Sequence, residues 1–328
     1  FFAATYIPKE TRYGHVGLLQ MIPEVKSLWQ TRREHIVSSA TEIIGALQGS
    51  DRIGSRRDVG EEILHRAFRS LSAGFDPVYG GFGQAPKFPS PHNFFFLLRY
   101  WKRTGETHAL QMVEHTVQNM RRGGIYDQIG FGFHRYSTDA RWIVPHFEKM
   151  LYDQALMAMA FIELFQATGK KEYETTAREI FTYVLRDMTH DQGGFYCAED
   201  ADSEGVEGKF YLWSEHEIRG VLSNDEAAYF LSNYKHDDDL TLQGMREMPA
   251  GSFIPHLKAL TGEESPESRT EIAGKMKEIL SRLFAHRSER VHPHKDDKIL
   301  TDWNGLMIAA LARGAQVFDE PVYARAAV

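Results

Sequence analysis

The segment QALMAMAFIELF (residues 154–165) decides the fold class, because apolar side chains occupy nearly every face of the helix it would form. A helix that is apolar all round is buried on all sides. The segments LMIAALA (306–312) and FFFLL (94–98) share this composition, and we expect the same burial for them. Residues 173–188 differ, because their apolar side chains form one stripe opposite charged ones. This alternation predicts a mainly α fold in concentric layers, with inner helices surrounded by outer ones.

Helical periodicity extends over most of the chain. Residues 1–8, FFAATYIP, predict a short strand closed by Pro8. Apolar residues then recur at helical spacing over residues 15–48, and the polar segment GSDRIGSRRD (49–58) is interpreted as a linker between two units. Further helices are predicted over residues 63–71, 92–101, 110–120, 145–168, 173–188, 269–284 and 303–318.

Three glycine pairs follow helical stretches: Gly80-Gly81, Gly123-Gly124 and Gly193-Gly194. Paired glycines permit positive φ angles and sharp exits from helices. Each pair is either a simple turn or one corner of a repeated helical hairpin. The spacings of 43 and 70 residues are unequal, which excludes a regular solenoid.

Composition excludes several classes of protein. The chain has 38 Lys and Arg against 45 Asp and Glu, a net charge of −7, which argues against a dedicated nucleic-acid-binding protein. Its longest wholly apolar run covers residues 155–162, well short of the roughly 20 residues that a membrane-spanning helix needs. A cytoplasmic location is expected, since no secretory signal is present. Cys197 is the one cysteine, which excludes an internal disulfide and predicts a packed residue rather than a nucleophile.

The segment GGIYDQIGFGFHRYSTDARWIVPHFEKMLYD (123–153) holds the densest group of polar and aromatic residues. Pro145 suits the first position of a helix, and in that helix His146 and Asp153 would share one face with Met150. Neighbouring positions carry Glu148, Lys149 and Tyr152. Because the helix becomes wholly apolar further on, we expect its polar first turns to open onto a cavity. The alternative is that these acids and His146 cap a helix end and form salt bridges there.

A second acidic segment, FYCAEDADSEGVEGKFYLW (195–213), begins like a calcium loop at Asp200. Tyr211 stands at the twelfth position, where an EF-hand needs a bidentate Glu, so we exclude an EF-hand. Glu204 and Glu207 are expected in a solvated loop, and residues 210–213 in a strand. Glu199 and Asp200 lie closer to the aromatic start of the segment and are therefore better candidates for a site.

Other polar groups give weaker signals. The pair His292-x-His294 lacks a third metal ligand, and the acidic run 237–239 is expected to be solvated. Asp302 is either a helix N-cap or a site residue. The chain has no Walker loop, GxGxxG, HExxH or GxSxG motif, so no metal and no cofactor is expected.

Four segments together resemble a known family: PKFP (86–89), residues 123–153, AEDADSEGVEGKFYLW (198–213) and DDKILTDWNGLMIAALA (296–312). They are similar to the YyaL-type family of thioredoxin-domain-containing proteins, which includes the spermatogenesis-associated thioredoxin-like proteins of animals. The resemblance implies a thioredoxin-like domain followed by an (α/α)-barrel similar to six-hairpin glycosidases and N-acylglucosamine 2-epimerases. Residues 1–48 would hold only the last strand and helix of the first domain, without the family's cysteine motif. Residues 59–328 would form the barrel without its last hairpins.

The residues and the resemblance together favour a carbohydrate-active barrel, either a sugar epimerase or isomerase or a glycoside hydrolase. Burial near neighbouring charges lets acids and imidazoles exchange protons at neutral pH. The candidate catalytic residues are Asp127, His134, His146, Glu148, Asp153, Glu199 and Asp200. The candidate residues for binding a small sugar-like molecule are Lys87, Tyr126, Arg135, Trp142, Lys149, Tyr152, Trp213, Asp302 and Trp303.

The two reactions assign these residues differently. In an epimerase, His134 or His146 would abstract the proton beside a carbonyl. In a hydrolase, two of Asp127, Glu148 and Glu199 would act as acid and as base or nucleophile. The alternative function is a non-catalytic barrel that binds a glycan or a protein partner beside a redox domain. Neither nucleic acid nor a membrane is expected as a partner.

Overall fold

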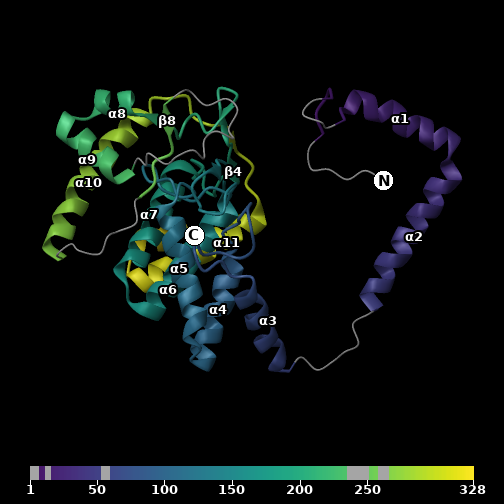
Figure 1. The fold of residues 1–328 in the computed structure, drawn as a ribbon, viewed down its shortest axis with the longest axis horizontal. Coiled ribbons are helices and arrows are strands. Elements are labelled where there is room, and N and C mark those ends of the chain that lie inside the picture. Colours follow the sequence, from purple (N-terminus) through teal and green to yellow (C-terminus); the bar gives the residue numbers. More distant parts are fainter. Residues whose placement is uncertain (1–6, 12–15, 53–59, 235–250, 258–265) are drawn as a thin grey trace. The chain divides into compact units, whose positions relative to one another are not determined.

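The computed structural model describes residues 7–11, 16–52, 60–234, 251–257 and 266–328. The chain divides into two compact units, residues 1–63 and residues 64–328. The mainly α class predicted from the sequence is confirmed (Figure 1). No helix in the described ranges is both long enough and apolar enough to cross a membrane.

The first unit contains two helices where the sequence predicts one over residues 15–48. Helix α1 (Leu18–Thr31) and helix α2 (Arg33–Arg52) are separated at Arg32, whose φ of −134° and ψ of 34° are not helical. Helix α2 continues to Arg52, into the segment interpreted as a linker. The rest of that segment lies outside the described residues, as do residues 1–6 of the predicted strand.

Helix α3 (Glu62–Ala73) spans the boundary, because the second unit begins at Leu64. The rest of this unit is built from helical hairpins. Helix α4 (Pro91–Thr104) pairs with α5 (Thr107–Arg122), α6 (Leu151–Thr168) with α7 (Lys171–Asp187), and α11 (Thr301–Phe318) with α12 (Pro321–Ala326). Helix α6 packs against both α4 and α11. These three form an inner row and their partners an outer row, which is the two-layered arrangement of an (α/α)-barrel.

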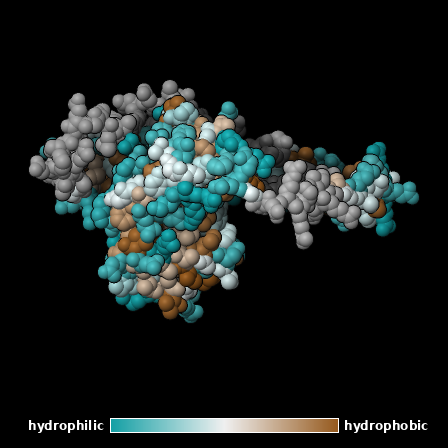
Figure 2. Space-filling view, turned by 90° about the horizontal axis from the view of Figure 1, so that it is seen from below, coloured by the Kyte–Doolittle hydropathy of each residue, from teal (hydrophilic) through white to brown (hydrophobic). Residues whose placement is uncertain are grey.

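Burial of the inner helices is less complete than the sequence predicts. In α6, buried residues from Leu151 to Leu164 cover most of the circumference, but Leu156, Met159 and Glu163 lie along one side and are only half-buried. In α11, Ile308 is 43% exposed, so the expectation of burial on all sides is wrong for residues 306–312. The reason is that composition sets only the tendency to be buried, whereas neighbouring elements decide which faces are covered. The face of the molecule that Figure 2 shows carries hydrophobic patches among polar residues, so apolar side chains are exposed elsewhere as well.

A separate group of helices forms a lobe with its own hydrophobic core. It consists of α8 (Glu215–Val221), α9 (Asn224–Tyr234) and α10 (Pro266–Arg287), and its core includes Ile218, Phe230 and Ile279. Strand β7 (Trp213–Ser214) pairs with β8 (Ser252–Phe253). Trp213 from β7 and Phe253 from β8 belong to this core. The predicted strand over residues 210–213 is thus limited to its last residue, because Phe210 and Tyr211 lie in a turn.

Short strands lie between the helices and hold the polar residues. Strands β3 (Lys149–Met150), β4 (Ala198–Glu199) and β9 (Lys295–Asp296) form an antiparallel sheet in the order β3-β4-β9. Two hairpins accompany it, β1 (Tyr136–Ser137) with β2 (Pro145–His146), and β5 (Asp202–Ser203) with β6 (Val206–Glu207).

These strands overturn one prediction. The helix expected to begin at Pro145 begins instead at Leu151, because His146 pairs with Tyr136 and Lys149 pairs with Glu199 in sheets. His146, Met150 and Asp153 therefore do not share a helix face. Pairing with strands distant in the sequence outweighs the local helical pattern here.

The glycine pairs serve two different purposes. Gly80, Gly81, Gly193 and Gly194 adopt positive φ angles, as the turn interpretation predicts. Gly124 does not, and the expectation is wrong for its pair. A Cβ atom on Gly124 would lie 2.1 Å from the carbonyl oxygen of Ile143, so glycine is needed there for close approach of two backbone segments.

Candidate functional site

Asp153 lies in the first turn of α6 and, among the acids of the described residues, is the one with a buried side-chain oxygen that lacks a hydrogen-bond partner. Its side chain is buried, its Oδ2 atom has no hydrogen-bond partner, and it does not cap the helix. Burial raises the pKa of Asp153 to about 8; Arg135 opposes this shift and Glu148 adds to it. Asp153 is therefore protonated at neutral pH and carries a proton that it can transfer.

His146, on strand β2, lies between two carboxylates. Its Nδ1 atom donates a hydrogen bond to Glu207 Oε1 at 2.7 Å, and its Nε2 atom lies 3.5 Å from Glu148 Oε2. Burial alone would lower the pKa of His146, but the hydrogen bonds to the two carboxylates raise it to about 9. The ring is therefore an imidazolium at neutral pH, with 27% of its side chain exposed.

Arg135 fixes Glu148 from the other side. Its Nη1 atom donates to Glu148 Oε2 at 2.9 Å, and its backbone N–H donates to the backbone oxygen of Glu148 at 2.8 Å. The contacts with His146 and Arg135 lower the pKa of Glu148, which stays ionised. The Nε atom of Arg135 is buried without a hydrogen-bond partner. We call Arg135, His146, Glu148, Asp153 and Glu207 the outer cluster.

Aromatic rings border the outer cluster. Tyr136 stacks on the ring of His146 with centroids 5.0 Å apart, and Phe88 packs on Tyr136 at 4.8 Å. Phe88 is 51% exposed, so this stack reaches the surface. Tyr152, whose charge interactions include Arg135 and Asp153, contacts Trp303 edge to face at 4.8 Å. Such rings offer apolar faces to the C–H groups of a sugar beside hydrogen-bonding side chains.

Glu207 is a residue of the outer cluster that the sequence patterns do not predict as part of a site. It was expected in a solvated loop, but the β5–β6 hairpin brings it to His146. Glu204 and Gly205 form the turn with φ angles of 53° and 75°, as a tight two-residue hairpin turn requires. Gly205 suits the positive φ that such a turn needs, but the partner of Glu207 lies 61 residues away and has no local sequence signal.

A second polar group, the inner network, is fully enclosed. Asp127 accepts hydrogen bonds from both terminal nitrogens of Arg287 at 2.8 Å and from Lys149 Nζ at 2.9 Å. Arg287 was not predicted. Burial alone would raise the pKa of Asp127, but the two cations hold it well below its usual value. Burial lowers the pKa of Lys149. Glu199 accepts a hydrogen bond from the hydroxyl of Tyr183 at 2.7 Å.

The cavity beside the inner network has a volume of about 50 Å³ and is lined by residues that include Lys149, Glu199 and Tyr211. Ligand pockets for small molecules measure roughly 300–1,000 Å³, whereas a water molecule occupies about 30 Å³. The structure therefore brings Asp127, Lys149 and Glu199 together, but in a space of the size of water.

Four other predicted residues are buried and use their polar atoms within the interior. His134 contacts the backbone oxygen of Phe147 through Nδ1 at 2.8 Å, and burial lowers its pKa to about 3, so it is neutral. Tyr126 Oη donates a hydrogen bond to Glu179 at 2.7 Å, and Trp142 Nε1 donates to the backbone oxygen of Tyr79 at 2.8 Å. Lys87 Nζ donates to Asp76 and to the backbone oxygens of Gly80 and Ala140.

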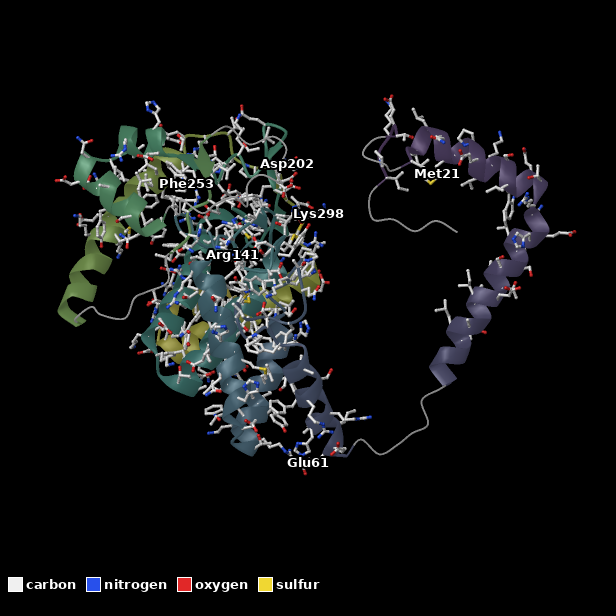
Figure 3. The ribbon with its side chains drawn as sticks, viewed as in Figure 1. Met21, Glu61, Arg141, Asp202, Phe253 and Lys298 are labelled. Atoms are coloured by element: carbon white, nitrogen blue, oxygen red, sulfur yellow. The ribbon has the colours of Figure 1, made fainter. Side chains whose placement is uncertain are left out.

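The last predicted residues lie apart from the outer cluster. Trp213 belongs to the core of the lobe, where the guanidinium of Arg290 lies 4.2 Å from its ring, beside a groove of about 590 Å³. Figure 3 shows Phe253, the strand partner of Trp213, on the side of the lobe and Asp202 on the side of the β5–β6 hairpin. Asp200 is exposed and accepts a hydrogen bond from the backbone of Asp202.

Asp302 is exposed in the first turn of α11, where Leu300 is the N-cap, and its carboxylate accepts from the backbone N–H of Trp303. Cys197 is buried, and burial raises the pKa of its thiol to about 11, so it is a packed residue, as predicted. Within the described ranges, no group of three His, Cys, Asp or Glu side chains could hold a metal ion. The acidic run 237–239 lies outside those ranges.

Comparison with known proteins gives one family match and several relatives. The family model described as "Thioredox_DsbH: Protein of unknown function, DUF255" matches residues 1–48, where the thioredoxin-like remnant is expected. Human spermatogenesis-associated protein 20 is 34% identical over 345 residues, which cover 95% of this chain and 43% of that protein. The uncharacterized protein B0495.5 of Caenorhabditis elegans is 31% identical over 346 residues, covering 97% of this chain and 47% of that protein. The chain thus spans less than half the length of these relatives.

Solved structures with similar folds are more distant. A sugar epimerase from a ruminal bacterium has 13% sequence identity and a TM-score of 0.36, with 81% of this chain and 84% of that chain covered. A D-mannose isomerase has 12% identity and a TM-score of 0.37, with 83% and 85% covered. A family 76 mannosidase from Bacteroides thetaiotaomicron has 12% identity and a TM-score of 0.38, with 79% and 64% covered.

Proposed function

We propose that this chain, which belongs to the YyaL-type family together with spermatogenesis-associated protein 20, catalyses acid–base chemistry on a carbohydrate-like small molecule. The reaction would be that of a sugar epimerase, an isomerase or a glycoside hydrolase. The observation that carries the proposal is the environment of Asp153, a buried acid with an unpartnered oxygen beside an ionised Glu148. A cytoplasmic location belongs to the same proposal.

The two acids of the outer cluster have opposite protonation states at neutral pH. When the surroundings of two neighbouring titratable groups shift their pKa values in opposite directions, the group with the raised pKa serves as the acid and the group with the lowered pKa as the base. Asp153, with its pKa raised to about 8, is the proton donor, and Glu148, with its pKa lowered, is the proton acceptor or nucleophile. His146 is already protonated, so we assign it to hydrogen-bond donation toward developing negative charge on oxygen rather than to proton abstraction.

The test is to assay epimerisation, isomerisation and hydrolysis over a panel of mono- and disaccharides at pH 7. Asp153→Asn keeps the size of the side chain but removes the transferable proton, and should lower kcat by about 10²-fold or more. Asp225→Asn, at an exposed position on α9, is the matched control and should change kcat less than twofold. A variant Asp153→Asn with full activity would remove Asp153 from the reaction.

The match of residues 1–48 to a thioredoxin-like model favours one other function, a barrel that binds a glycan or protein beside a redox domain. Sugar binding without turnover in every assay of the panel would support this second function.

A further inference from the structure

We propose that the outer cluster selects an uncharged, hydroxyl-bearing ligand and discriminates against sugars that carry an ammonium or a carboxylate group. The inference rests on the proposed function only in placing the ligand at the same site. It follows from two features of the cluster, the pairing of its charges and the chemistry of its two unpartnered atoms.

The charged side chains of the cluster already pair with one another. Arg135 pairs with Glu148 at 2.9 Å, and His146 pairs with Glu207 at 2.7 Å. The site therefore offers no free counter-charge from these four residues. A charged ligand would give up part of its hydration without gaining a partner of opposite charge, which is unfavourable.

The unpartnered atoms favour a hydroxyl group. Arg135 Nε–H is a donor and Asp153 Oδ2 belongs to a carboxyl group, and both are buried without a hydrogen-bond partner. Arg135 is also one of the two charged groups that act on Asp153. A hydroxyl can accept from the arginine and also donate to, or accept from, the carboxyl group. An ammonium has no lone pair with which to accept from Arg135. A carboxylate can accept from Arg135 and from the protonated Asp153, but it would be held among side chains whose charges are already paired, so it gains no counter-charge for its lost hydration.

Leaving such buried groups without partners is costly, because each loses its hydrogen bonds to water and gains none in the protein. A neutral sugar satisfies both with one or two hydroxyls, while its C–H face can pack on the Tyr136 and Phe88 rings that border the cluster. An ammonium at that position leaves Arg135 Nε without an acceptor, whereas a carboxylate is disfavoured by its lost hydration rather than by an unpartnered atom.

The experiment is isothermal titration calorimetry of the full chain at pH 7 with three matched sets of sugars. Each set contains a hexose, its 2-amino-2-deoxy analogue and its uronic acid, in the gluco, manno and galacto configurations. In at least one set the neutral hexose should bind at least tenfold more tightly than both charged analogues. Equal or tighter binding of a charged analogue, or no binding of any neutral hexose, would overturn the proposal.

Two variants place the binding at the cluster. Asp153→Asn stays uncharged and keeps both a donor and an acceptor, so binding of the neutral hexose should change less than about threefold. Asp153→Leu is close in volume but has neither, and should weaken binding tenfold or more in a protein whose circular dichroism spectrum is unchanged. Equal affinity of the two variants would place the sugar elsewhere and contradict the assignment.

The outcome separates this inference from the proposed function. Preferential binding of the neutral sugar without turnover removes the enzyme but keeps the ligand class. Turnover of an amino sugar or a uronic acid keeps the enzyme and removes the ligand class.

Discussion

At the scale of single residues, the two carboxylates around His146 determine its charge. We expect its pKa, followed by NMR of the imidazole carbons, to be about 9 and to fall toward the ordinary value of about 6.5 in Glu207→Gln. Because the folded-state pKa is raised, the stabilisation from His146 is complete below pH 6.5 and is lost as pH rises through 9.

His134 provides the internal control for this titration. It is buried and its contact is with the backbone oxygen of Phe147, so Glu207→Gln should leave its low pKa unchanged. A His146 pKa near 9 in the variant would show that Glu148 alone holds the imidazolium.

The residues of the outer cluster could be predicted only in part. Arg135, His146, Glu148 and Asp153 were found because they lie within one dense polar and aromatic segment. Glu207 of the outer cluster and Arg287 of the inner network could not be predicted, because their partners lie 61 and 160 residues away and no local pattern indicates such pairs. The pKa values that distinguish Asp153 from Glu148 depend on burial and contacts, which the sequence does not contain.

At the scale of elements, helices were predictable and short strands were not. Helix α7 follows from a one-sided apolar stripe and occurs close to its predicted position, whereas α6 follows from a nearly continuous apolar run and has the predicted end but a later start. Strands β2 and β3 have two residues each, too few for a period of two to be visible. Their pairing with Tyr136 and Glu199 places His146 and Lys149 outside the helix that the sequence predicts.

The β5–β6 hairpin has to hold Glu207 in place, and Gly208 is the residue that permits it. Gly208 has a φ of +76°, and a Cβ atom there would lie 2.4 Å from the ring of Phe147. We expect Gly208→Ala to destabilise the protein and, by displacing Glu207, to lower the pKa of His146. Urea denaturation and the NMR titration of His146 measure the two effects.

Gly205→Ala is the matched control for the hairpin. Gly205 has nearly the same φ, +75°, but a Cβ atom there would meet nothing within 4 Å. This variant should cost only the strain of the left-handed conformation, about 1–2 kcal/mol, and leave the His146 pKa unchanged. Equal losses of stability in both variants would contradict a steric role for Phe147.

At the scale of the whole molecule, a buried ion pair between Arg287 and Asp127 joins the lobe to the barrel. Arg287 ends α10, a helix of the lobe, and Asp127 lies in the loop that follows α5. Lys149 on β3 completes the network from the strand that precedes α6. The lobe and the barrel have different hydrophobic cores, although Ile129 from the loop after α5 packs into the lobe core, and this network adds a specific polar connection beside it.

Removing Asp127 should therefore be far more damaging than removing a surface carboxylate. Asp127→Asn leaves two buried cations without a counter-charge, which costs about 3–5 kcal/mol in the free energy of unfolding. Glu163→Gln breaks a bidentate pair with Arg99, whose side chain is 63% exposed, and should cost less than about 1 kcal/mol. Urea denaturation at pH 7 measures both variants, and equal losses would contradict the importance of the buried network.

The pH dependence of this loss identifies its cause. Because the pKa of Asp127 is held well below its usual value, its stabilisation is present above pH 4 and is lost as pH falls further, so the variant and the wild type converge in acid. At high pH they should also approach each other, for a different reason. Lys149, whose pKa burial already lowers, can give up its proton when Asp127 is gone, whereas Arg287 cannot. The difference that remains at high pH then measures the cost of leaving Arg287 alone, and it is this arginine that connects the lobe to the barrel.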